Sequence, residues 1–303
     1  MGNKIVFMGT PAFAAVSLQK LLDSGFEVAA VFTQPDRPRS RGMKLQPCEV
    51  KVLALERGLP VYQPASLREE GVLDTLRGIG PDAIAVVAYG CLLPRAILDL
   101  PPCGCVNLHG SLLPKYRGAA PVQWTVLNGD EYAGVSCMFM SDKLDAGDVI
   151  SSRKVRVSPD ETSGELFGRL APVGSELLAE TLRDVLSGTA SAVPQDENEA
   201  TYAPPLSRDM SPIDWSLPAD GILCRIRGLH PWPCATAELR GTVFRIHRAA
   251  RTDSDGSEPG TILRADGKGL VVAAGEGAVE ILELQAPGGR RMRAADYLRG
   301  HAL

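Results

Sequence analysis

The chain has 303 residues, of which 45% are hydrophobic, 22% charged and 5% aromatic, and this composition excludes a disordered or fibrous protein. Because the chain is longer than a single hydrophobic core usually allows, we expect two domains. The net charge of −4 argues against a broadly basic, nucleic-acid-binding surface. We expect a cytoplasmic protein without a membrane span, because no apolar run reaches about 18 residues and the N-terminus lacks a signal-peptide cleavage pattern.

Cysteine usage gives no sign of a covalent or metal framework. The seven cysteines are odd in number and include no C-x-x-C pair. Neither a disulfide network nor a zinc site is therefore expected, and we predict no bound metal. The cysteines are interpreted as reduced and mostly buried side chains.

Strands and helices alternate along the first half of the chain. Residues 4–8 read as a buried strand, and Gly9, Thr10 and Pro11 lead into an apolar-periodic helix that extends to Leu22. The same alternation predicts strands at 28–32, 59–62, 83–88 and 104–108, with helices near 48–57 and 119–127. This order is typical of an α/β fold with a mostly parallel sheet.

The second half changes character twice. Strands are expected at 135–140 and 149–155, followed by a long amphipathic helix in which Pro172 should cause a kink or a break. We predict a first domain at 1–188 and a polar, proline-rich linker at 189–206. Residues 207–303 contain five short strand-like runs with turn signals, which indicates a small C-terminal β-barrel of the OB type.

Common phosphate-binding and nucleophile motifs are absent. The first strand is followed by G-T-P-A-F, which lacks the glycines of a dinucleotide fingerprint. The chain also contains neither a P-loop nor a nucleophile elbow. We therefore expect the site elsewhere, at the carboxyl ends of the sheet strands.

One polar cluster stands at such a strand end. Asn107 and His109 are two residues apart, so their side chains project from the same face of a strand. Asn107 could donate to a developing oxyanion, His109 could exchange a proton, and Asp145 or Asp148 could hold the imidazole. The same residues could equally cap a turn, sit at the surface and shape a hairpin.

A basic stretch is the main departure from the acidic composition. Four cations lie within eight residues, at Arg37, Arg39, Arg41 and Lys44. Such a run is typical of a solvated loop, but it could also contact a polyanion. Residues 207–303 hold 13 Lys and Arg against 12 Asp and Glu, whereas residues 1–206 hold 19 against 24.

Five segments in order closely resemble the methionyl-tRNA formyltransferase family. They are GTPAF, FTQPDRPRSRG, VVAYGCLLP, NLHGSLLPKYRGAAPVQW and LDAGD, and the similarity covers essentially the whole chain. The HGSLLPKYRGAAP part of the fourth segment and the fifth segment are typical of enzymes that use 10-formyltetrahydrofolate, including glycinamide ribonucleotide formyltransferase. The basic stretch and the C-terminal ATYAP, IDWS and HPWP segments resemble the tRNA enzyme.

The resemblance implies a fold and a set of site residues. It implies a Rossmann-like catalytic domain, a C-terminal OB-like tRNA-binding domain, and a monomer. It assigns catalysis to Asn107, His109 and Asp145. It places the folate donor against Ser111, Leu112, Leu113, Pro114, Val86, Tyr89, Gly90 and Leu92, and the methionyl-tRNA against Phe13, Arg37, Arg39, Arg41 and Lys44.

The expected reaction is formyl transfer from 10-formyltetrahydrofolate to the α-amino group of methionyl initiator tRNA, for translation initiation. Two alternatives remain open at this point. The same catalytic residues could serve a formyltransferase that acts on a small-molecule amine, such as an amino sugar or a ribonucleotide. The chain could also be a non-enzymatic RNA-binding protein, for which His109 would be dispensable.

Overall fold

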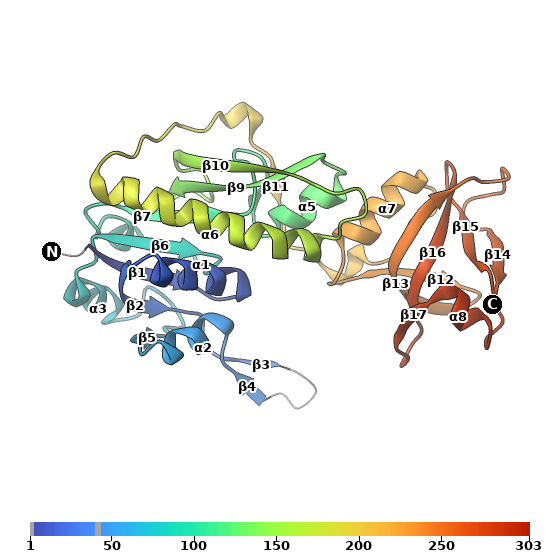
Figure 1. Cartoon of the computed structure of the whole chain (residues 1–303), viewed down its shortest axis with the longest axis horizontal. Helices are drawn as coiled ribbons and strands as arrows, with labels where there is room; N and C mark the ends of the chain where they lie inside the picture. Colours follow the sequence, from blue (N-terminus) through green and yellow to red (C-terminus); the bar gives the residue numbers. More distant parts are fainter. Residues whose placement is uncertain (1–2, 40–43) are drawn as a thin grey trace. The chain divides into compact units, whose positions relative to one another are not determined.

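The computed structural model of the chain describes residues 3–39 and 44–303 (Figure 1). The chain divides into two compact units, each built from several segments. The first unit comprises Met1–Gly118, Gly134–Val155 and Phe167–Tyr202, and the second comprises Ala119–Ala133, Arg156–Leu166 and Ala203–Leu303. In the described part of the chain, no helix is both long and apolar enough to span a membrane.

A seven-stranded sheet forms the centre of the first unit. Its strand order is β10-β9-β7-β6-β1-β2-β5, and the pairs from β7 to β5 are parallel, whereas β7 and β9 are antiparallel. The strands are β1 (Lys4–Gly9), β2 (Glu27–Phe32), β5 (Val61–Tyr62), β6 (Ala83–Val87), β7 (Cys105–His109), β9 (Tyr132–Phe139) and β10 (Val149–Arg156). This arrangement confirms the predicted Rossmann-like, mostly parallel sheet.

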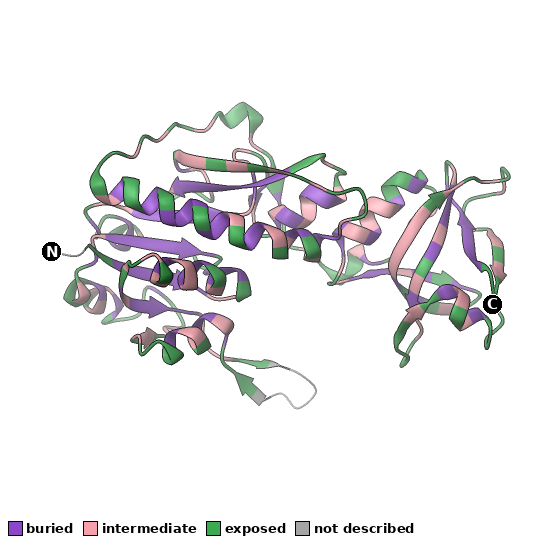
Figure 2. Cartoon of the chain, in the orientation of Figure 1, coloured by how far each residue is buried: buried purple, intermediate pink, exposed green. Residues whose placement is uncertain are grey.

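Continuous apolar runs explain why the central strands are buried. Every residue of β6 and β7 is buried, and so are the last five residues of β1 (Figure 2). Helices must cover both faces of such strands, since neither face tolerates water. The helices in this part of the chain are α1 (Ala12–Asp23), α2 (Glu49–Glu56), α3 (Val72–Ile79), α4 (Arg95–Leu98) and α6 (Ser163–Ser187).

The predicted break at Pro172 does not occur, because α6 remains one continuous helix. A proline inside a helix removes one backbone hydrogen bond and costs about 3 kcal/mol. The long apolar face of α6 offsets that cost, since each buried leucine contributes about 1.5–3 kcal/mol. The side chains of Leu170, Leu178 and Leu182 are completely buried.

The second unit contains a curled antiparallel sheet that forms a half-barrel, in agreement with the small C-terminal β-barrel domain predicted from the sequence. Its strands have the order β12-β13-β16-β15-β14, and β17 pairs with β16. Register shifts near Arg248 interrupt the long strand β13, as a bulge does where a sheet bends. The strands are β12 (Ala235–Leu239), β13 (Thr242–Thr252), β14 (Ile262–Asp266), β15 (Gly269–Ala273), β16 (Ala278–Gln285) and β17 (Arg291–Arg293).

The core of this second unit lies inside the curled sheet. Phe244, Leu270 and Ile281 are among its buried residues, and helices α5 (Pro121–Leu127), α7 (Ala219–Gly228) and α8 (Ala294–Leu298) complete the unit. The remaining short elements are β8 (Arg117–Gly118), β11 (Tyr202–Ala203) and two 3₁₀ turns, Glu197–Glu199 and Arg208–Met210.

The basic stretch begins and ends in a short hairpin. Strands β3 (Arg37–Arg39) and β4 (Lys44–Gln46) pair antiparallel, with Arg37 opposite Gln46. Asp36, at the start of the hairpin, accepts a 2.7 Å hydrogen bond from the Lys51 ammonium group. This bond lowers the pKa of the Asp36 carboxyl group, and a second bond from Gln63 acts in the same direction. These contacts fix the base of the hairpin.

Candidate active site

Asn107 and His109 lie on β7, at the boundary between the parallel and antiparallel parts of the sheet. In the register of the sheet, Asn107 lies between Val86 of β6 and Met138 of β9. Their alternation along the strand directs both side chains to one face. Only 8% of Asn107 and 7% of His109 is exposed. The structure therefore brings the two predicted residues together in a largely desolvated position.

The side-chain amide of Asn107 has no protein partner. Among the residues that the structure describes, no group forms a hydrogen bond with this amide. The amide atoms are not among the fully buried atoms without a partner, so the amide remains accessible to a ligand. The unpaired amide of Asn107 is therefore a ready donor for the oxygen of a bound ligand.

The imidazole of His109 is oriented by a backbone carbonyl. Its Nε2 lies 2.8 Å from the carbonyl oxygen of Tyr116. A carbonyl can only accept, so Nε2 carries the proton of the neutral ring and Nδ1 is left as an acceptor. Nδ1 lies 3.8 Å from Oδ2 of Asp145, which is too long for a hydrogen bond but close enough for charge attraction once the ring carries a second proton.

Of the two acids left open by the sequence, Asp145 is the one beside His109, whereas Asp148 is exposed. The Asp145 side chain is 15% exposed, and its Oδ2 accepts a 2.8 Å hydrogen bond from the backbone N–H of Gly118. Its backbone has φ +48°, a left-handed conformation that costs a non-glycine residue about 1–3 kcal/mol. The surrounding contacts must hold it there.

The segment predicted to line the folate site follows directly after His109. Ser111 is 1% exposed, and its hydroxyl donates to the carbonyl of Lys115 at 2.6 Å. The Ser136 hydroxyl donates to the carbonyl of Ser111 and accepts from the N–H of Leu113. The Leu113–Pro114 peptide is cis. The hydroxyl of Ser111 thus serves the loop itself, and the partly buried side chains of Leu112, Leu113 and Pro114 remain for ligand contacts.

The other predicted folate residues follow β6. The side chains of Val86 and Tyr89 belong to a buried apolar cluster, and burial raises the pKa of the Tyr89 phenol to about 12. Gly90 has φ +88°, and Leu92 is 63% exposed. In this segment Ala88, Gly90, Cys91 and Leu92 are exposed.

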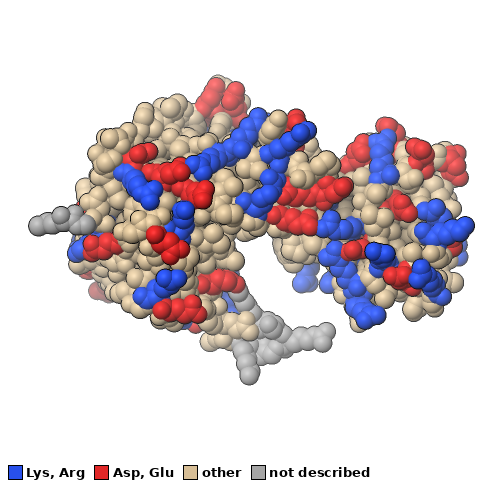
Figure 3. Space-filling model, in the orientation of Figure 1, with Lys and Arg blue, Asp and Glu red and all other residues tan. Residues whose placement is uncertain are grey.

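The residues predicted to contact the tRNA substrate are distributed differently. Phe13 is a core residue of α1, with its ring centroid 4.9 Å from that of Phe167. Arg37 is exposed on the hairpin, whereas Arg41 and the side chains of Arg39 and Lys44 lie outside the described residues. On the face in Figure 3, blue and red side chains alternate over both units, in agreement with the small net charge.

Comparisons with known proteins identify the family. A formyl transferase model matches residues 3–182, and a model of the formyl transferase C-terminal domain matches residues 205–302. The methionyl-tRNA formyltransferase of Trichlorobacter lovleyi is 46% identical over 302 residues, which cover 100% of this chain and 95% of the relative. That of Moorella thermoacetica is 48% identical over 301 residues, 99% and 97% of the two chains. The chain belongs to the methionyl-tRNA formyltransferase family.

Solved structures share the fold of this member of the methionyl-tRNA formyltransferase family. HypX from Aquifex aeolicus, in complex with tetrahydrofolic acid, has a TM-score of 0.62 at 17% identity, over 97% of this chain and 46% of that one. An N-formyltransferase from Helicobacter canadensis, in complex with folinic acid and dTDP-3-aminofucose, has a TM-score of 0.68 at 14% identity, over 96% and 100% of the chains.

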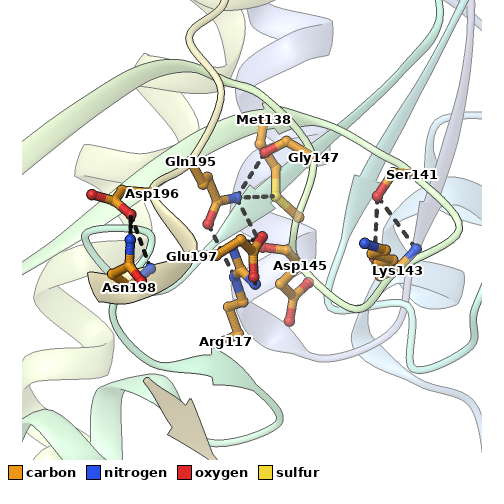
Figure 4. A network of polar contacts seen from close by, with 10 residues as sticks. All are labelled: Arg117, Met138, Ser141, Lys143, Asp145, Gly147, Gln195, Asp196, Glu197 and Asn198. Atoms are coloured by element: carbon orange, nitrogen blue, oxygen red, sulfur yellow. Dashed lines mark hydrogen bonds and ion pairs between the residues drawn. The ribbon is translucent and has the colours of Figure 1, made fainter. Parts of the chain in front are cut away.

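Sequence reasoning missed two groups that shape the site. The Tyr116 carbonyl orients His109, but a backbone carbonyl belongs to every residue type and leaves no signal in a sequence. The amide of Gln195 donates to the carbonyl of Asp145 at 2.9 Å and to that of Gly147 at 2.7 Å (Figure 4). Gln195 lies 50 residues beyond Asp145 in a polar stretch, so no local pattern links the two.

Proposed function

We propose that this chain transfers the formyl group of 10-formyltetrahydrofolate to the α-amino group of methionyl initiator tRNA. A bond forms between the amine nitrogen and the formyl carbon, and the bond between that carbon and N10 of the folate breaks. The amine loses a proton and N10 gains one. Full-length similarity to methionyl-tRNA formyltransferases supports this acceptor over a small-molecule amine or a purely RNA-binding role. The observation that carries the proposal is the unpaired amide of Asn107 beside the His109–Asp145 pair.

Asn107 is the proposed donor to the formyl oxygen. The folate, when bound, supplies an electrophilic formyl carbon whose oxygen gains negative charge as the amine attacks. The unpaired amide of Asn107 suits that oxygen, because no existing hydrogen bond has to break. One such donor in a desolvated site contributes about 2.7–4 kcal/mol to the transition state.

His109 is the proposed acceptor of the amine proton. With Nε2 held by the Tyr116 carbonyl, Nδ1 presents its lone pair on the side where Asp145 lies. Once protonated, the ring becomes a cation 3.8 Å from the Asp145 carboxylate, which stabilises it. The Asp145 carboxylate therefore lies beside the nitrogen that accepts the proton, and the Tyr116 carbonyl selects the tautomer.

The proposed folate site combines two segments of the first unit. Leu112, Leu113 and Pro114 offer apolar contacts close to His109. The turn after β6 offers Leu92 and the backbone from Val86 through Tyr89 to Gly90, since the side chains of Val86 and Tyr89 are buried. The side-chain amide of Asn107, which has no hydrogen-bond partner among the described residues, suits the carbonyl oxygen of a formyl group.

The proposed tRNA contacts are the basic stretch and the C-terminal unit. The family resemblance assigns Arg41 to the acceptor end of the tRNA and Phe13 to the methionyl group. We expect Arg41→Ala to lower kcat/KM for initiator tRNA and leave the KM for the folate unchanged, with Arg95→Ala, in a surface ion pair with Asp99, as the control. Equal kcat/KM values in wild type and Arg41→Ala would remove Arg41 from the tRNA site.

The functional organisation that we propose has three parts: a catalytic domain at 1–188, a linker at 189–206 and a tRNA-binding domain at 207–303. The scheme contains no metal ion, because Asn107 stabilises the developing oxyanion and His109 accepts the amine proton. We propose that the chain acts as a monomer in the cytoplasm, where initiator tRNA is charged and used.

An acceptor-specificity assay tests the proposed function. Labelled formyl transfer from the folate is measured with methionyl initiator tRNA, methionyl elongator tRNA and free methionine. We expect efficient transfer to the initiator tRNA alone. Transfer to a small-molecule amine such as an amino sugar, without transfer to the initiator tRNA, would contradict the proposal. A folate analogue is expected to raise the melting temperature in proportion to ln(1 + [L]/Kd).

A further inference from the structure

A buried arginine lies behind the candidate site. Arg117 is 2% exposed and is the largest fully buried side chain among the described residues. Its two terminal nitrogens donate to the two carboxylate oxygens of Glu197, each at 3.0 Å, and its Nε donates to Oε1 of Gln195 at 3.1 Å. The hydrogen bond to Glu197 raises the pKa of Arg117. A buried cation is costly unless it is fully paired, so this one is held in a single geometry.

Arg117 fixes the orientation of the Gln195 amide. Arginine can only donate, so the oxygen of the amide must face Arg117. The amide nitrogen must then face the opposite side, where the carbonyls of Asp145 and Gly147 both accept from it (Figure 4). The reversed amide would place oxygen against two carbonyls and nitrogen against a cation. The Gln195 amide is therefore locked toward the turn that carries Asp145.

The turn that carries Asp145 contains a residue with an unfavourable backbone conformation and a glycine whose neighbours leave no space for a side chain. Asp145 adopts φ +48°, and a Cβ atom on Gly147 would lie 1.7 Å from the carbonyl oxygen of Phe139. A left-handed residue of this kind persists only where its surroundings determine it. Two contacts do so, because Gln195 binds the Asp145 carbonyl and the Gly118 N–H binds its carboxylate.

The backbone on either side of Arg117 holds both members of the acid–histidine pair. The preceding residue, Tyr116, accepts from His109 with its carbonyl, and the following residue, Gly118, donates to the Asp145 carboxylate. The N–H of Arg117 itself donates to the carbonyl of Thr201 at 2.8 Å. One short segment, anchored through Arg117, therefore sets the separation of His109 and Asp145.

We propose that Arg117 and Gln195 are positioning residues that hold the Asp145 carboxylate opposite Nδ1 of His109. Neither residue touches the reacting atoms. Arg117 orients Gln195, Gln195 holds the backbone of Asp145, and Asp145 stabilises the protonated imidazole. The inference rests on the proposed function, because it assigns Asp145 a part in formyl transfer.

Gln195→Met tests this role, because it keeps the length of the side chain and removes both hydrogen bonds to the turn. We expect kcat to fall about tenfold with both KM values unchanged, since misplacing a charge-stabilising group acts on the transition state. Gln195→Glu, which still accepts from Arg117 but cannot donate to the carbonyls, should show the same loss. If Gln195→Met does not fold, the fall in kcat is measured with Gln195→Glu and Arg117→Lys instead.

The matched control is Gln19→Met. Gln19 also bridges an arginine and an acceptor, since it accepts from Arg57 at 2.7 Å and donates to Asp23 at 2.6 Å, but it lies on α1. We expect wild-type kcat for this variant. If kcat of Gln19→Met fell as far as that of Gln195→Met, the loss of any bridging glutamine would have the same effect, and the proposal would be overturned.

A double-mutant cycle separates positioning from general stability. If Gln195 acts through Asp145, Gln195→Met should change kcat less than twofold when Asp145→Asn is already present. An undiminished tenfold fall in that background, or wild-type kcat in the single variant, would overturn the proposal.

Amide hydrogen exchange measures the stability of the turn that carries Asp145 in the absence of substrate. We expect faster amide exchange over residues 141–149 in Gln195→Met than in wild type, and no change in Gln19→Met. A wild-type chain without transfer activity would refute the proposed function, whereas unchanged exchange in Gln195→Met would refute the positioning role.

Discussion

Replacing Asn107 with alanine should separate catalysis from stability. The amide has no hydrogen-bond partner among the described residues, so its removal orphans no protein group. We therefore expect the free energy of unfolding to change by less than about 1 kcal/mol. The loss of a donor to the formyl oxygen should instead raise the activation barrier by about 2.7–4 kcal/mol, which corresponds to a fall in kcat of about 10²- to 10³-fold.

Steady-state transfer of labelled formyl and urea unfolding measure the two effects on the same preparation. Asn198→Ala is the control, because Asn198 is an exposed amide that binds Asp196 instead of facing the site. A kcat within about threefold of wild type for Asn107→Ala would refute the oxyanion role. A large loss of stability with proportionate loss of activity would show that the amide is structural.

Three further predictions concern the catalytic residues, two glycines and the hairpin base. His109→Ala and Asp145→Ala should each lower kcat by about 10²-fold or more with little change in tRNA affinity, and additive losses in the double variant would contradict a joint role. Gly147→Ala should destabilise the chain, because the new Cβ atom would clash with the carbonyl of Phe139. Gly168→Ala, at a position on α6 with open space, should stabilise the chain by about 0.5–1 kcal/mol. Equal unfolding midpoints for the two variants would contradict both expectations. The lowered pKa of Asp36 stabilises the fold above the ordinary carboxyl value, and this stabilisation is lost as pH falls below about 4. Asp36→Asn should flatten that part of the pH–stability profile, and an unchanged profile would contradict the assignment.

The sheet could be predicted from sequence because its signals are long and redundant. The apolar runs at 4–8 and 83–88 each span a whole buried strand, and β1 and β6 occupy nearly the same residues. Helix α4 has four residues, which is too short for a helical period to appear. The break predicted at Pro172 is absent because the local cost of the proline is smaller than the burial gained along all of α6.

Only part of the site could be predicted from the sequence, because only some of its residues are brought together by local structure. Asn107 and His109 are two residues apart, so strand geometry alone puts them together. The choice of Asp145 over Asp148 came from the family resemblance, because both follow the same turn. Gln195 lies in a stretch whose composition reads as a linker, and its contacts depend on the fold of the whole unit.

Formyl transfer to methionyl initiator tRNA by wild type and by His109→Ala, under single-turnover conditions with saturating folate donor, tests the central claim most directly. The account predicts formylmethionyl-tRNA with wild type and a rate at least about 10²-fold lower with the variant. Equal rates for the two proteins, or no formylmethionyl-tRNA with wild type, would contradict it.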